Sequence, residues 1–173
     1  MITDFEQIQA FWSQVEKTLD KLLESQEDAY FDDEHLLEEY RISLQKIDRN
    51  LTFHFERDAG EGPVEMVFGC DGYPESIHSV LSLVSMAPAL SGIQFKAFNE
   101  RCNPVPARVN LGDDICQIDE FWCSLRLIDG KLQLAIYLDE LPDILDMDPR
   151  VEAVMIFMDA LIGEFELMTR VWS

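Results

Sequence analysis

Three residues have the chemistry of a nucleophilic or acid/base site. Cys70 and Asp71 lie in an expected turn between a strand and a helix, and His54 lies on the preceding strand. A thiol becomes a nucleophile when a base such as histidine takes its proton, and a strand-to-helix turn often binds anions. One hypothesis is therefore a hydrolase-type enzyme with a carboxylate or Cys/His site near the turn at 70–75. Only proximity in sequence groups these residues, so this hypothesis is the alternative.

Paired carboxylates offer a second kind of chemistry. Asp113-Asp114, Asp119-Glu120 and the acids of 139–148 could place carboxylates close together. Such clusters bind Ca²⁺ or Mg²⁺, or act as an acid/base pair. Because the chain holds 34 acids in 173 residues, these pairs also arise by chance. The four cysteines include no C-x-x-C pair, and the three histidines lie far apart. We expect no metal, no cofactor and no catalytic residue.

The most distinctive chemical feature is a run of acids at 24–39. This segment contains eight acidic residues and no lysine or arginine. An acidic patch speeds association with a basic partner and selects that partner, as in immunity proteins for basic toxins and inhibitors of nucleases. We predict a non-enzymatic interaction module of the inhibitor or immunity-like type that binds a basic protein. The residues that we expect to bind are Glu27, Asp28, Asp32, Asp33 and Glu34. The alternative is a solvated connection between two helices.

Two helices are expected to position this acidic run. Large apolar residues at three- and four-residue spacing, from Phe5 to Leu22, predict a helix over 3–24. A second helix begins after Asp32 or Asp33, because acids favour the positive N-terminal end of a helix.

The remaining pattern predicts an α+β fold. Alternating apolar residues indicate strands at 51–56, 64–68, 93–98, 108–111, 121–127, 132–138 and 165–172. Asp129-Gly130 predicts a two-residue hairpin. A third helix runs from Pro74 to about residue 87 with the apolar stripe Ile77, Val80, Leu81 and Val84, and a fourth runs from Asp148-Pro149 to Gly163. The order is ααββαββββαβ. We expect a single domain, 1–173, in which two N-terminal helices and two further helices pack on a mainly antiparallel sheet.

The stretch from Leu51 to Arg101 resembles an uncharacterised bacterial domain-of-unknown-function family. The shared features are the strand LTFHFE, the strand and turn VEMVFGCDGYPE, a helix ending in Ala87-Pro88, and a strand ending in Phe-x-x-Arg. The Phe11-Trp12 pair and the Leu-Ile-Gly-Glu element at 161–164 are similar to elements of the same family. The resemblance implies a helix–sheet core and a bacterial cytoplasmic setting, and it implies no reaction.

Composition excludes several classes of protein. The formal net charge of -21 argues against binding to nucleic acid phosphates or an anionic membrane. A hydrophobic fraction of 47% is too high for a disordered acidic tail. No apolar run is long enough to cross a bilayer, and the first ten residues lack the basic residues of a secretory signal, so we expect a cytoplasmic protein. The alternating face of 121–127, or the first helix, could pair with a second copy, which leaves a homodimer open.

Overall fold

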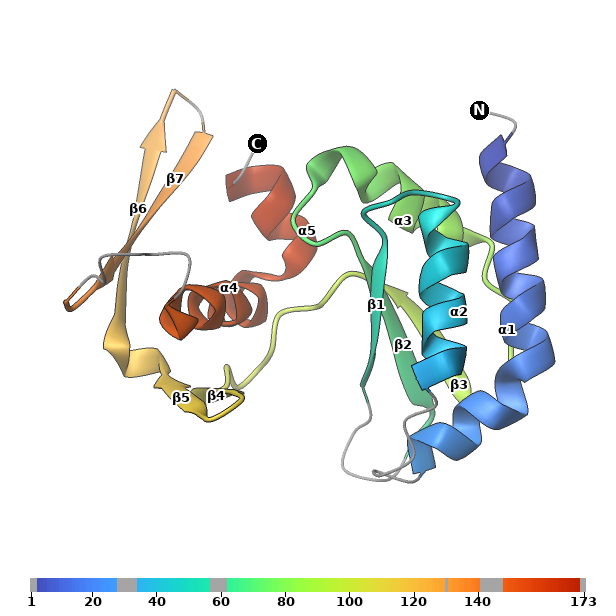
Figure 1. Ribbon diagram of the computed structural model, residues 1–173. Helices are drawn as coiled ribbons and strands as arrows, with labels where there is room; N and C mark the ends of the chain where they lie inside the picture. The colour runs from blue at the N-terminus through green and yellow to red at the C-terminus, as the bar shows by residue number, and fades with distance from the viewer. Residues whose placement is uncertain (1–2, 28–33, 57–61, 130, 141–147, 172–173) are drawn as a thin grey trace. The chain divides into compact units, whose positions relative to one another are not determined.

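The computed structural model describes residues 3–27, 34–56, 62–129, 131–140 and 148–171 (Figure 1). The fold is α+β with mainly antiparallel sheets, as the sequence predicts. The contacts divide the chain into two compact units, Met1–Phe98 and Asn99–Ser173. The prediction of a single domain over 1–173 stays a prediction. None of the helices in the described ranges is long and apolar enough to span a membrane.

The first unit consists of three helices and a three-stranded sheet. Its elements are α1 (Thr3–Glu27), α2 (Glu34–Gln45), β1 (Thr52–Glu56), β2 (Val64–Gly69), the 3₁₀ turn η1 (Pro74–Ser76), α3 (Ile77–Ser85) and β3 (Ile93–Ala97). Strand β2 is central, antiparallel to β1 and parallel to β3. Helix α3 makes the crossover that a parallel pair requires. Helix α2 runs back alongside α1 (Figure 1).

Aromatic rings form the core of this unit. Phe11 meets Trp12, Tyr40 and Phe68 edge to face, with ring centroids 5.0, 6.0 and 5.9 Å apart. This geometry is favourable beyond the apolar area that it buries. The predicted face of α1 is therefore confirmed at Phe11 and Trp12, but its first member, Phe5, is 54% exposed.

The buried face of α3 differs from the predicted stripe. Leu81 is 45% exposed, and Leu83 is fully buried in its place. Two hydrogen bonds accompany this orientation of the helix. The side chain of Asn50 donates to Ser76 Oγ at 2.9 Å, and Ser79 Oγ donates to Asp48 Oδ2 at 2.8 Å. These bonds hold the serine side of the helix against residues 48–50.

The second unit contains two separate hairpins and a helical C-terminal part. Its elements are β4 (Arg108–Leu111), β5 (Asp114–Gln117), the 3₁₀ turn η2 (Ile118–Glu120), β6 (Phe121–Ile128), β7 (Lys131–Leu138), α4 (Pro149–Ile162), α5 (Glu164–Glu166) and the π-helix η4 (Leu167–Val171). Both hairpins are antiparallel. The predicted tight hairpin at 129–130 is confirmed by its register, in which Ile128 faces Lys131. Gly130 itself lies outside the described residues.

The prediction of a last strand at 165–172 is wrong, because described residues 164–171 are helical. Leu167 and Met168 are adjacent and both fully buried, whereas neighbouring side chains of a strand point to opposite faces. Leu167 packs with Val154 and Met158 of α4. Strand β5 was not predicted. It follows a turn in which Gly112 has a φ of 63°, a conformation that favours glycine.

Candidate functional site

The predicted binding residues border the connection between α1 and α2. Glu27 is the last residue of α1, and Glu34 is the first residue of α2 and is exposed. Asp28, Asp32 and Asp33 lie outside the described residues. The structure thus places the two described ends of the acidic run at one end of a helical hairpin.

Neighbouring carboxylates extend this acidic end along both helices. Glu24 is exposed in α1, and Glu38 and Glu39 are exposed in α2. Glu38 accepts from the Arg41 guanidinium at 3.3 Å, and Glu39 lies 3.4 Å from the ring nitrogen of His35. Both pairs are exposed, and such pairs contribute little to stability. The last turn of α1 contains no basic residue. The negative end of the helix dipole therefore adds to the carboxylate charge.

Two polar contacts hold the helices beneath this acidic end. The hydroxyl groups of Thr18 and Tyr40 share a hydrogen bond of 2.6 Å, and Ser43 Oγ donates to Gln14 Oε1 at 2.6 Å. Burial raises the pKa of Tyr40, the bond with Thr18 opposes that change, and the charge of Glu39 adds to it. Tyr40 therefore stays neutral and keeps its bond at physiological pH.

The structure does not bring together the residues of the alternative enzyme site. Cys70 is fully buried, and its thiol donates to the carbonyl oxygen of Tyr73 at 3.3 Å. His54 is exposed on β1, where its ring nitrogen lies 3.2 Å from Glu56 Oε1. Asp71 is exposed at a φ of 54°. The thiol of Cys70 is therefore buried at the turn, whereas the His54 ring is exposed beside Glu56.

The second unit does bring acids from distant segments together. Asp114, Asp148 and Glu152 line one cavity of about 540 Å³, whose apolar wall includes Leu111 and Met155. These acids come from two of the clusters that the sequence singles out, and from α4. Among the described residues, however, no three His, Cys, Asp or Glu side chains converge closely enough to hold a metal ion. The cavity is therefore an acidic hollow formed by the β4–β5 turn and the start of α4.

The charges of nearby acids act on the thiol of Cys116. Burial raises the pKa of its thiol, and the charges of Glu120, Asp114 and Asp148 raise it further, while Arg150 opposes them. A thiol of this kind is a poor nucleophile at neutral pH, because the thiolate is the reactive form. Cys116 packs against Ala153 and Phe157 of α4, so its role is in the core.

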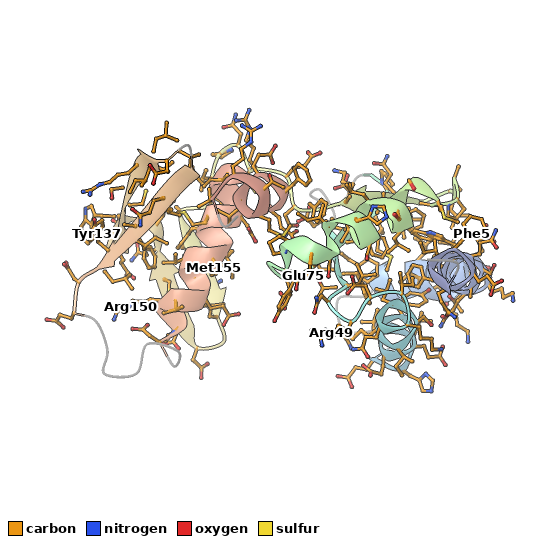
Figure 2. The ribbon with its side chains drawn as sticks, turned by 90° about the horizontal axis from the view of Figure 1, so that it is seen from above. Phe5, Arg49, Glu75, Tyr137, Arg150 and Met155 are labelled. Carbon is orange, nitrogen blue, oxygen red and sulfur yellow. The ribbon has the colours of Figure 1, made fainter. Side chains whose placement is uncertain are left out.

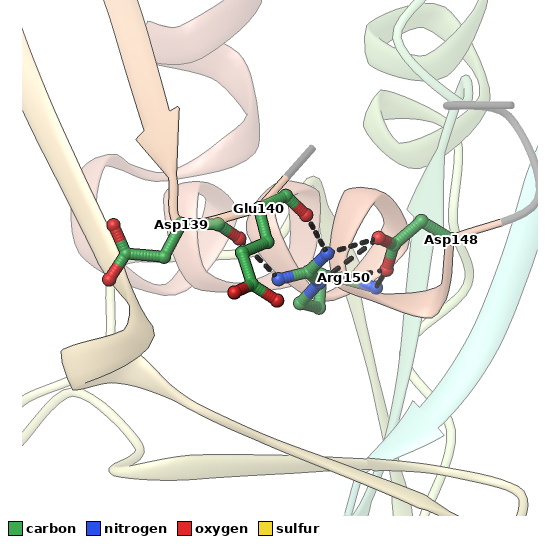
Figure 3. Close-up of polar contacts among 4 residues, drawn as sticks. All are labelled: Asp139, Glu140, Asp148 and Arg150. Atoms are coloured by element: carbon green, nitrogen blue, oxygen red, sulfur yellow. Dashed lines mark hydrogen bonds and ion pairs between the residues drawn. The ribbon is translucent and has the colours of Figure 1, made fainter. Parts of the chain in front are cut away.

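Arg150 bridges Asp148 and the backbone of residues 139–140 (Figure 3). Its Nη2 lies 2.6 Å from Asp148 Oδ2 and donates to the carbonyl of Glu140 at 3.0 Å, while Nη1 donates to the carbonyl of Asp139 at 2.9 Å. The Asp148 carboxylate also accepts from the Arg150 backbone N–H, which caps α4. The side-chain and backbone bonds from Arg150 hold the pKa of Asp148 below its usual value. The sequence predicts the Asp148 cap, but no local signal indicates the contacts of Arg150 with 139–140.

Comparison of the chain with protein-family models, with curated proteins and with solved structures finds no match, so the resemblance of residues 51–101 to a bacterial family stays an expectation.

Proposed function

We propose that this protein is a non-enzymatic interaction module, of the inhibitor or immunity-like type, that binds a basic protein through the acidic end of its α1–α2 hairpin. The observation that carries the proposal is the exposed carboxylates on both helices next to the connection, Glu24 on α1 and Glu34, Glu38 and Glu39 on α2. In sequence, Glu27, Asp28, Asp32 and Asp33 lie between Glu24 and Glu34.

Helix stability explains only part of this charge. Glu34 lies in the first turn of α2, where a carboxylate is favourable. Glu24 lies in the last turn of α1, and a carboxylate is unfavourable at the C-terminal end of a helix. A sequence selected for stability alone places lysine or arginine there. Acids at both helix ends therefore fit selection for a negative surface.

The framework beneath the surface suits a binding role. The Thr18–Tyr40 and Gln14–Ser43 contacts fix the two helices before any partner arrives. A preorganised surface loses little conformational entropy on binding. The fitting partner presents lysine and arginine side chains on one face, and its association weakens as salt screens the charges.

The test compares two variants that lose the same charge. The site variant carries Glu27→Gln, Asp28→Asn, Asp32→Asn, Asp33→Asn and Glu34→Gln. The matched control carries Glu→Gln at Glu6, Glu16, Glu75, Glu100 and Glu152, all of which are exposed. Each immobilised chain is exposed to native lysate at low and at moderate salt, and retained proteins are identified.

We expect the wild-type chain and the control to retain a basic protein at low salt, and less of it at moderate salt. The site variant should retain little of that protein. Equal retention by the site variant and the control would show that only overall charge matters. Retention of no basic protein at low salt would also contradict the proposal.

A further inference from the structure

The β6–β7 hairpin of the second unit exposes large apolar side chains on both of its faces. On one face, the register places Trp122 directly opposite Tyr137, and these side chains are 53% and 50% exposed. Figure 2 shows Tyr137 on the outer side of the hairpin, away from α4. Single exposed apolar residues are ordinary on protein surfaces, but a contiguous set on one element marks an interaction site.

The other face is only partly covered by its own unit. Leu134, Ile136 and Leu138 of β7 pack against Val154, Met158 and Leu167. Leu125 and Leu127 continue the same face of β6 toward the turn, yet they are 50% and 72% exposed. Figure 1 shows the turn end of the hairpin extending past the helices of this unit. The uncovered leucines therefore extend an apolar core surface beyond the helices that cover it.

The hairpin also has strand edges without a partner in the described part of the chain. β6 and β7 each contain eight residues and pair only with each other there. Neither strand contains proline, and both strands together contain only two charged residues, Arg126 and Lys131. Natural sheets usually protect an edge of this length with charges, proline or a bulge, because open edges add further strands. A sheet of three or more strands is also more stable than two strands alone.

The net charge of the hairpin favours a second copy of this chain as the partner of the β6 edge. Residues 121–138 contain two basic residues and one acid, Asp129, which gives a net charge of +1 in a chain whose net charge is -21. A basic partner is not attracted to this segment. Two copies of so acidic a chain repel each other least where they meet through it. A β6 edge is also self-complementary, because two antiparallel copies of one strand are related by a twofold axis.

We propose that two copies of this chain associate through their β6 edges, forming one four-stranded antiparallel sheet in which β6 strands are central. In this sheet Leu125 and Leu127 of the two copies lie on one face, and the Trp122 side chains of both copies lie on the other. This interface is separate from the acidic end of the α1–α2 hairpin and does not depend on the proposed function. Its salt dependence has the opposite sign, because screening removes the repulsion between two acidic chains and leaves the apolar contacts.

The test is sedimentation of the full chain over a range of concentrations, from about 0.01 M to about 1 M NaCl, where the Debye length falls from about 30 Å to about 3 Å. We expect a monomer–dimer equilibrium whose dissociation constant falls as salt rises. Leu127→Lys places a charge in the interface at a side chain that tolerates exposure, and should raise that constant at least about tenfold. Leu161→Lys makes the same change at a 45% exposed position of α4 and should leave the dissociation constant unchanged.

Hydrogen exchange supplies a second readout that does not rely on a variant. Amides along the outer edge of β6 should become protected only at concentrations where the dimer forms. A chain that stays monomeric at every concentration and salt would overturn the proposal. A dimer that Leu127→Lys leaves intact, or whose β6 amides exchange as fast as in the monomer, would overturn it equally.

Discussion

The indole N–H of Trp12 donates a buried hydrogen bond of 2.9 Å to the backbone carbonyl of Leu83, 71 residues farther along the chain. This bond joins α1 to the end of α3. The ring of Trp12 also packs edge to face against Phe95 of β3, with ring centroids 4.6 Å apart. One side chain therefore contacts a second helix and the sheet of the first unit.

Replacing Trp12 should destabilise the first unit. Trp12→Phe removes the bond to Leu83 and leaves a void where the larger ring was, at a total cost of about 1–3 kcal/mol. The matched control is Trp122→Phe at the 53% exposed position, which should change stability by less than about 0.5 kcal/mol. Urea unfolding followed by circular dichroism, at a concentration where the chain is monomeric, gives both values. Equal effects of the two substitutions would contradict the role of the Trp12 contact.

The contacts of Arg150 should stabilise the start of α4. Arg150→Lys keeps the charge but cannot bridge Asp148 and the carbonyls of residues 139 and 140 at once, because lysine lacks the planar fork of arginine. We expect faster hydrogen exchange at the amide of Arg150, which caps α4 through Asp148, and a lower melting temperature. Arg126→Lys makes the same change on an exposed strand position and is the control. Unchanged exchange in Arg150→Lys would show that these bonds do not stabilise the start of α4.

Asp48 should make the first unit sensitive to acid. Burial alone would raise its pKa, but hydrogen bonds from Asn50, Ser79 and Ser76 and the charge of Arg49 outweigh burial, so the pKa lies below the ordinary 3.8. The ionised carboxylate therefore stabilises the fold above pH 3.8, and this stability is lost as the pH falls through the lowered pKa.

The variant Asp48→Asn isolates this contribution. The difference in free energy of unfolding between wild type and variant should be about 0.5–1 kcal/mol above about pH 5, kept small because solvent screens the partly exposed group. The difference should shrink steadily below pH 3.8. Hydrogen exchange of α3 amides measures it within the first unit. A difference that is constant with pH would contradict the ionic role of Asp48.

Gly163 occupies a backbone position that other residues cannot adopt without strain. Its φ of 95° and ψ of 139° lie outside the left-handed helical region, and an added Cβ would meet Glu166 Oε2 at 3.2 Å and the Asn99 carbonyl at 3.5 Å. Gly163→Ala should cost about 1–3 kcal/mol. Gly112→Ala at a φ of 63° meets no atom within 4 Å, and should cost about 1 kcal/mol. Calorimetry of the two variants compares their losses of stability. A larger loss in Gly112→Ala than in Gly163→Ala would contradict this prediction.

The sequence alone predicts the elements whose signals are local. Three elements depend on residues within a turn or two of one another. They are the apolar face of α1, the Asp148-Pro149 start of α4 and the tight hairpin after Ile128. Backbone hydrogen bonding and side-chain periodicity are decided over that distance, so residue type and spacing carry the information. The acidic run is visible in sequence for the same reason.

Tertiary contacts decide the rest. Residues 165–171 alternate like a strand, but they form helix, in which Leu167 packs against α4 and the adjacent Met168 is also fully buried. The serine side of α3 contacts Asp48 and Asn50, about 30 residues away in sequence, and no local pattern indicates these contacts. The acids around Cys116 and the contacts of Arg150 with residues 139 and 140 also join segments that are distant in sequence. These features require segments far apart in sequence to meet, and no local pattern encodes which segments will do so.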